Sequence, residues 1–159
     1  MSVADLSPAA ARVARALAAR GVDCTVRELP ASTRTAAEAA AAIGCRVEQI
    51  AKSIVFRGAV SGEPILVVAS GGSRVDERRL AAAAGEGIER ADPDFVKREL
   101  GFAIGGVPPL GHARPVRTFV DPGLLELDTV WAAAGTPHAV FSIAPGDLLR
   151  ATGGELLEE

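Results

Sequence analysis

The chain has 159 residues, of which 48% are hydrophobic and 23% charged, which is enough apolar material for one globular domain with a real core. Lys and Arg number 17 against 20 Asp and Glu, for a net charge of −3, and five Phe and one Trp are accompanied by no Tyr. This balance argues against a broad cationic face for nucleic acid and against aromatic rings that stack bases in series. Any contact with a nucleic acid should therefore be small.

Cysteine content and hydropathy narrow the class further. Cys24 and Cys45 are the only cysteines, and no Cys-x-x-Cys pair or Cys/His cluster is present. We therefore expect two reduced thiols, no bound metal and no other cofactor. The chain does not open on a charged-then-apolar leader pattern, and no apolar run approaches the roughly 20 residues of a membrane span. These observations predict a cytoplasmic protein without membrane contact.

Helix and strand signals share the first half of the chain. Capping residues and glycines mark helix ends, and Thr35 with Glu38 has the spacing of a capping box. In chain order we expect a helix capped by Ser7 and running to Arg20, a strand over 22–29, a helix from Thr35 through Ile43, a helical turn over 47–51, strands over 52–56 and 65–69, a helix from Asp76 through Ala84, and a helix from Asp92 through Leu100. The strands over 52–56 and 65–69 are predicted to form an antiparallel pair in the centre of the sheet.

The second half is richer in strands and is punctuated by Gly and Pro. In chain order we expect a short strand over 102–104, a long structured loop over 105–115, strands over 117–120, 129–132 and 138–143, and a helix from Pro145 to Gly153. Helices and strands mix without strict β-α-β alternation. The predicted fold class is therefore α+β (mixed α/β): a compact single domain over 1–159 with a central mixed, largely antiparallel sheet flanked by helices.

The loop Gly105-Gly106-Val107-Pro108-Pro109 is the least ordinary stretch of the sequence. Its two glycines let a ligand approach the main chain, and its two prolines fix the exit and remove competing N–H donors. A fixed loop with exposed amides is suited to hold a carbonyl oxygen or an oxyanion. The alternative is that it is only a tight connection between strands.

Three further residues are candidates for chemistry. Lys52 begins an apolar strand, so its ammonium either reaches solvent past the strand end or points into a pocket, where it could bind a phosphate or a carbonyl. His112 and His138 are each open to a structural or a functional role. Neither histidine has an adjacent Ser or Cys in a nucleophile motif.

Four segments together resemble a known family. They are Lys52-Ser53-Ile54-Val55-Phe56, the stretch from Gly101 to His112, Ala134-Gly135-Thr136-Pro137-His138, and Pro145-Gly146-Asp147-Leu148-Leu149. In this order and spacing they resemble the YbaK-type aminoacyl-tRNA deacylases, which are similar to the editing insertion of bacterial prolyl-tRNA synthetases. The resemblance runs from Ser7 to Gly153. It implies the mixed α/β fold of that family and a hydrolase that cleaves, in trans, the ester between a wrong amino acid and the terminal adenosine of a tRNA, commonly tRNA for proline.

The resemblance also implies site residues. The catalytic set it implies is Lys52, the loop residues Gly105, Gly106, Val107 and Pro109, and His138, which falls where the synthetase insertion carries a histidine. Loop amides would stabilise the oxyanion, Lys52 would bind the terminal nucleotide or the aminoacyl carbonyl, and a water assisted by a tRNA ribose hydroxyl would attack. The implied substrate-binding residues are Thr35, Ser53, Phe102, Ile104, Ala133 and Gly135.

Substrate and partners follow from the same resemblance. Some relatives that act on cysteinyl-tRNA carry serine where this chain has Ala133. A small apolar wall favours a small wrong amino acid such as alanine, cysteine or serine. The expected partners are the aminoacyl-tRNA 3′ end and a prolyl-tRNA synthetase that supplies tRNA identity, with weak binding of uncharged tRNA. Two alternatives stay open: a non-catalytic module that binds an aminoacyl-adenosine or a nucleotide, and an esterase of small molecules.

Overall fold

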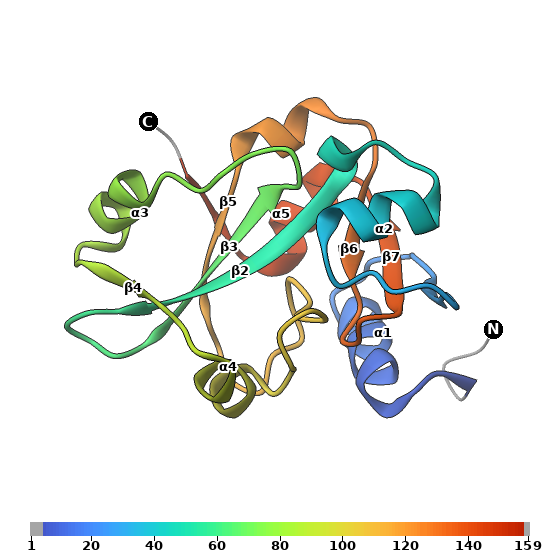
Figure 1. The fold of residues 1–159 in the computed structure, drawn as a ribbon, viewed down its shortest axis with the longest axis horizontal. Coiled ribbons are helices and arrows are strands. Elements are labelled where there is room, and N and C mark those ends of the chain that lie inside the picture. Colours follow the sequence, from blue (N-terminus) through green and yellow to red (C-terminus); the bar gives the residue numbers. More distant parts are fainter. Residues whose placement is uncertain (1–4, 158–159) are drawn as a thin grey trace.

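The computed structural model describes residues 5–157, which fold around one eight-stranded mixed sheet (Figure 1). The strands are β1 (Val26–Glu28), β2 (Ile50–Gly58), β3 (Pro64–Ser70), β4 (Ile88–Arg90), β5 (Arg117–Val120), β6 (Val130–Ala133), β7 (Ala139–Ile143) and β8 (Glu155–Leu156). The α-helices are α1 (Pro8–Ala19), α2 (Ala36–Ile43), α3 (Glu77–Ala84), α4 (Pro93–Leu100) and α5 (Pro145–Thr152). Two short 3-10 helices, η2 (Val47–Gln49) and η3 (Pro122–Glu126), complete the set.

The sheet mixes strand directions as the sequence predicts. Its order is β1-β7-β6-β2-β3-β5-β8, and β4 also pairs with β2. The pairs β1–β7, β2–β3, β2–β4 and β6–β7 are antiparallel, whereas β2–β6, β3–β5 and β5–β8 are parallel. The expected central antiparallel pair is thus β2 with β3. In Figure 1, α3 and β4 lie at one end of the sheet, and α1 and α2 lie at the other.

The core has two main parts, one on each face of β3. Every residue of β3 is buried. Leu66 and Val68 face the larger cluster, which includes apolar side chains of α1, α4 and α5. Ile65 and Val67 face the smaller one, where Leu80 of α3 packs. Because both faces of β3 are covered, this strand is an apolar run without alternation.

The helix boundaries follow the capping signals closely. The hydroxyl of Thr35 accepts the N–H of Glu38 at 3.1 Å, and the carboxylate of Asp92 accepts the N–H of Phe95 at 2.8 Å. Ser7 differs, because it precedes α1 without making a side-chain cap, and its buried hydroxyl has no partner. None of the described helices is long and apolar enough to cross a membrane.

Two predicted strands are wrong in whole or in part. The strand expected over 22–29 is reduced to β1, because the N–H of Val22 still bonds to Leu17 at the end of α1, 3.0 Å away. Residues 102–104 form a bend instead of a strand, since Phe102 turns into the core and the chain reverses at once through Gly105. The short elements β4, β8 and η3 were not predicted.

One edge of β2 is interrupted. β3 pairs with β2 from Ala51 to Arg57 along the other edge. On the interrupted edge, β6 pairs only at Ile50 and Ala51, and β4 pairs only from Phe56 onward. No described strand therefore pairs with residues 52–55 on that side. The site described next opens at this break.

Candidate functional site

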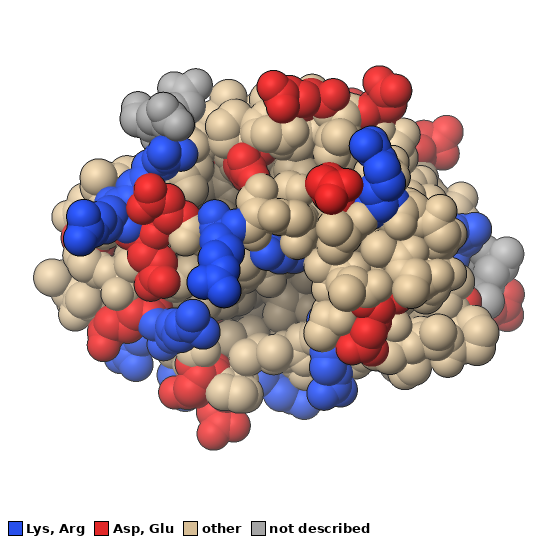
Figure 2. Space-filling view, turned by 45° about the horizontal axis from the view of Figure 1, so that its top comes forward, with Lys and Arg blue, Asp and Glu red and all other residues tan. Residues whose placement is uncertain are grey.

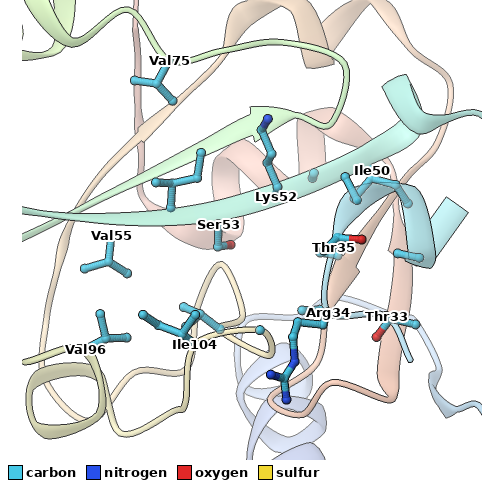
Figure 3. A pocket seen from close by; sticks show the side chains of 18 of the residues that line it. Thr33, Arg34, Thr35, Ile50, Lys52, Ser53, Val55, Val75, Val96 and Ile104 are labelled. Carbon is cyan, nitrogen blue, oxygen red and sulfur yellow. The ribbon is translucent and has the colours of Figure 1, made fainter. Parts of the chain in front are cut away.

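A cavity of about 620 Å³ opens at the break beside β2. Its wall combines β2 with the segment leading into α2, the loop around Gly105, and the end of β6 (Figure 3). In the space-filling view, Lys and Arg side chains lie around a hollow on this side of the molecule (Figure 2). The volume is in the range of sites that hold a small molecule or the end of a larger one.

The structure brings seven of the twelve predicted site residues to the cavity wall. They are Thr35, Lys52, Ser53, Ile104, Gly105, Val107 and Ala133. The other five are not among the residues that line it: Phe102, Gly106, Pro109, Gly135 and His138. The second group surrounds or supports the loop and the turn after β6, as the following paragraphs describe.

Lys52 and Ser53 leave β2 on opposite faces of the sheet. Figure 3 shows the Lys52 side chain extending away from the Ser53 side chain. The Lys52 ammonium donates to the main-chain carbonyl of Ser73, with Nζ 2.6 Å from the oxygen. Ser53 shares its face with Val55, which packs on the same cluster as Val107. The cavity thus has a cationic side near Lys52 and a loop side near Ser53.

The loop offers two main-chain donors to the cavity. The N–H of Gly106 is used within the loop, because it donates to the carbonyl of Ala103 at 3.1 Å. Across the described residues, the N–H groups of Gly105 and Val107 have no recorded partner, and both residues line the cavity. Donors held in this way can stabilise a developing negative charge on oxygen.

Gly106 itself is a packing residue. A Cβ at this position would lie 2.6 Å from the main-chain Cα and C of Thr136, in the turn between β6 and β7. In that turn, a Cβ on Gly135 would lie 2.8 Å from the carbonyl oxygen of Ala9 in α1. The loop and the turn therefore interlock through positions where only glycine fits. Two separate sequence motifs meet here for a structural reason.

Phe102 and His112 hold the loop from behind. Phe102 is buried, the Arg12 guanidinium lies 4.3 Å from the centre of its ring, and the ring meets that of His112 edge-on. The Nε2 atom of His112 lies 2.7 Å from the carbonyl oxygen of Pro108. His138, in contrast, is exposed, and its Nδ1 lies 3.1 Å from the carbonyl oxygen of Ala31.

His112 should make the stability of the fold depend on pH. Burial lowers the pKa of its imidazole below the ordinary value of 6.5, and Arg20 and Arg12 act in the same direction, while the hydrogen bond to Pro108 opposes them. Below pH 6.5 the unfolded chain binds a proton at this histidine that the folded chain resists. The free energy of unfolding should therefore fall as pH drops from 7 to 5, by up to about 1.4 kcal/mol per pH unit.

Urea titrations at several pH values measure this effect. In His112→Gln, which cannot take up the proton, the part of the pH dependence due to His112 should disappear. An unchanged slope in that variant would contradict the role of His112.

The sequence did not indicate several residues of the site. Arg34, Arg74 and Arg90 line the cavity, and none of their guanidinium groups has a recorded ion-pair partner within residues 5–157. Arg34 lies across Gly105, where a Cβ would meet its Cγ at 2.8 Å. These arginines come from three separate segments, so no local spacing could reveal them. Among the described residues, no group of three or more His, Cys, Asp or Glu could hold a metal ion.

The chain matches a family of known description. The family model of the aminoacyl-tRNA editing domain matches residues 30–151, a stretch that contains all of the cavity wall. This match covers well over half of the chain, so the chain belongs to the aminoacyl-tRNA editing domain family. The mixed sheet, the interrupted edge and the loop beside it are thus the fold and the candidate site of an editing domain.

Three relatives show the extent of the similarity. The protein YwhH of Bacillus subtilis (strain 168), described as uncharacterized, is 32% identical over 123 residues, which are 77% of this chain and 78% of YwhH. A crystal structure of a candidate trans-editing enzyme for prolyl tRNA synthetase is 47% identical, with a TM-score of 0.89 and 96% of each chain covered. The structure of hypothetical protein APE2540 is 29% identical, with a TM-score of 0.85, covering 91% of this chain and 96% of that one.

Proposed function

We propose that this protein hydrolyses, in trans, the ester bond of a mischarged aminoacyl-tRNA, with tRNA for proline carrying a small wrong amino acid as the substrate. The observation that carries the proposal is the cavity itself. In a chain of the editing-domain family, it places two unpaired loop amides, of Gly105 and Val107, opposite the edge of β2. This arrangement favours binding of an ester carbonyl between the loop and the strand.

The loop side of the cavity would hold the aminoacyl group. In the attack step, water adds to the ester carbonyl and the oxygen gains negative charge, which the N–H groups of Gly105 and Val107 would stabilise. The tetrahedral intermediate then expels the ribose oxygen, which takes up a proton. Such donors contribute a few kcal/mol each to catalysis. The wall nearby is apolar, with Val55, Val96 and Ile104 among its residues, which suits a small side chain.

The cationic side would hold the nucleotide end. Lys52, Arg34, Arg74 and Arg90 line the cavity, and Glu77 is the one carboxylate among its described lining residues. Guanidinium and ammonium groups without acidic partners are suited to the phosphates next to a terminal adenosine. We therefore assign Lys52 to the nucleotide and not to the reacting carbonyl, because its ammonium lies on the face away from Val107.

The proton of the attacking water has no obvious protein acceptor at the loop. Glu77 follows the Asp76 cap at the start of α3, and α3 packs on the face to which Lys52 projects. His138 is outside the described cavity wall. A hydroxyl of the terminal ribose, which the ester places beside the reacting carbon, is the group we propose to orient the water. Catalysis would then depend on an intact tRNA end.

A panel of charged tRNAs tests the proposal. Transcripts of tRNA for proline, charged with alanine, serine, cysteine or proline, are incubated with the protein, and release of the amino acid is followed against the uncatalysed rate. We expect release of at least one of the three wrong amino acids and sparing of prolyl-tRNA. Release of none, by protein shown to be folded, would refute the function.

Two other outcomes would support the alternatives. Saturable binding of a non-hydrolysable aminoacyl-adenosine analogue without any ester turnover would indicate a binding module. Hydrolysis of simple esters that lack adenosine, at rates equal to those for aminoacyl-tRNA, would indicate a small-molecule esterase. The cationic side of the cavity favours editing over the esterase, because a simple ester offers nothing for those charges to bind.

A further inference from the structure

The interrupted edge of β2 leaves one residue with its main-chain groups facing the cavity. On the paired edge, Gly58 donates its N–H to the carbonyl of Glu63 at 2.9 Å, and the carbonyl of Ile50 accepts the N–H of Gly71 at 2.6 Å. Main-chain groups along a strand alternate between its two edges. Residues 50, 52, 54, 56 and 58 therefore point toward β3, and Ser53 points its N–H and C=O toward the break.

No described group satisfies the polar atoms of Ser53. The ladder to β6 stops at Ala51 and the ladder to β4 starts at Phe56, so neither strand reaches it. The Ser53 hydroxyl is buried and has no hydrogen-bond partner. Figure 3 shows this side chain directed into the space between β2 and the loop, toward the region of Ile104. Three polar groups of one residue are thus left open at one place.

Such groups are costly unless something binds to them. Leaving a buried polar group without a partner costs roughly 1–3 kcal/mol. The sheet elsewhere supplies partners for its strands, so the deficit at Ser53 is local and faces a cavity lined by Ser53 itself. A ligand that supplies N–H donors to the carbonyl and the hydroxyl would remove the deficit. The chemistry required is that of a compact donor with several hydrogens.

We infer that Ser53 binds the α-ammonium group of the aminoacyl substrate through its main-chain carbonyl and its hydroxyl oxygen. This inference rests on the proposed function, since that function places an aminoacyl ester in the cavity. In such an ester the ammonium is one carbon away from the carbonyl, which the amides of Gly105 and Val107 would hold. Ser53 and Val107 lie on the same side of the sheet, so one aminoacyl group can reach both.

Neutral oxygens are the available acceptors on this face. Glu77, the carboxylate among the described lining residues, is on the α3 side of the sheet, where Lys52 projects. The walls next to Ser53 are the apolar side chains of Val55, Val96 and Ile104. The site would therefore read the α-ammonium, which all amino acids share, separately from the side chain, which meets only apolar groups. An ester of an α-hydroxy acid would lack the recognised group.

A pair of non-hydrolysable analogues tests the inference without relying on turnover. 3′-Amino-3′-deoxyadenosine is acylated with L-alanine or with L-lactate, which differ only in ammonium against hydroxyl, and binding of each is measured by calorimetry. The alanyl compound should bind at least about 20-fold more tightly, a difference typical of hydrogen bonds to a charged group. Equal affinities, within threefold, would overturn the inference while leaving the hydrolysis panel to decide the function.

Variants locate the recognition at Ser53. In Ser53→Ala, which keeps the carbonyl but loses the hydroxyl, the preference for the alanyl compound should shrink about fivefold or more, and Ser53→Thr should restore it. Ser142→Ala is the matched control, because Ser142 is a half-buried strand serine that does not line the cavity. An undiminished preference in folded Ser53→Ala would overturn the role of the hydroxyl. Ester turnover without this preference would contradict the inference and support the function.

Discussion

Gly106→Ala should lower kcat/KM for ester hydrolysis by at least about a hundredfold, comparable to the loss of an oxyanion donor. The added methyl would lie 2.6 Å from main-chain atoms of Thr136, which cannot rotate away. The loop must then move, and the N–H groups of Gly105 and Val107 move with it. Overpacking of this kind also costs about 1–3 kcal/mol of stability, so the free energy of unfolding should fall as well.

A matched glycine separates the two effects. Gly146 lies in the first turn of α5, and a Cβ there would meet nothing within 4 Å. Gly146→Ala should therefore keep both activity and stability. Both variants are assayed at a temperature at which urea titration shows them to be folded. Wild-type turnover by folded Gly106→Ala would show that the loop geometry is not needed for the reaction.

Lys52→Ala should lower kcat/KM on aminoacyl-tRNA by about 10- to 100-fold, which corresponds to one lost contact between charged groups. The fold should be unaffected, because the ammonium bonds only to the carbonyl of Ser73, at an exposed site. If Lys52 binds a phosphate, the loss should fall mainly on KM and should shrink when the substrate is an aminoacyl-adenosine without phosphate. Initial rates on the two substrates measure this difference.

Lys97 provides the control, since it is the only other lysine of the chain and is exposed on α4, away from the cavity wall. Lys97→Ala should retain wild-type kinetics on both substrates. An equal loss on both substrates in Lys52→Ala would place Lys52 at the ester instead of the phosphate. Unchanged kinetics in Lys52→Ala would remove it from the site altogether.

Most of the fold could be predicted because local signals agree with the tertiary structure. The caps Thr35, Asp76 and Asp92 set helix starts that the structure reproduces, and the β2–β3 pair follows from two apolar runs around a turn. The strand expected at 102–104 failed for a tertiary reason. Phe102 is apolar because it supports the loop from the core, and burial of this kind does not distinguish a strand from a bend.

The site was harder to predict than the fold. The resemblance brought Lys52, Ser53 and the loop together, and the structure places them around one cavity. It did not distinguish lining residues from supporting ones, so Gly106 and Phe102 were expected to contact the substrate. The break beside β2 depends on where β6 stops and β4 begins, and three-residue strands such as β4 leave almost no sequence signal.

The cations at the cavity mouth have a consequence for how a tRNA arrives. The whole molecule carries a net charge of −3, so a polyanion is repelled at long range. Within a Debye length of about 8 Å at physiological ionic strength, the local positive charge outweighs that repulsion. Electrostatic steering would then orient each encounter toward the mouth without prolonging it. Such a protein can sample many tRNAs in brief collisions and remain only on one whose acyl group fits.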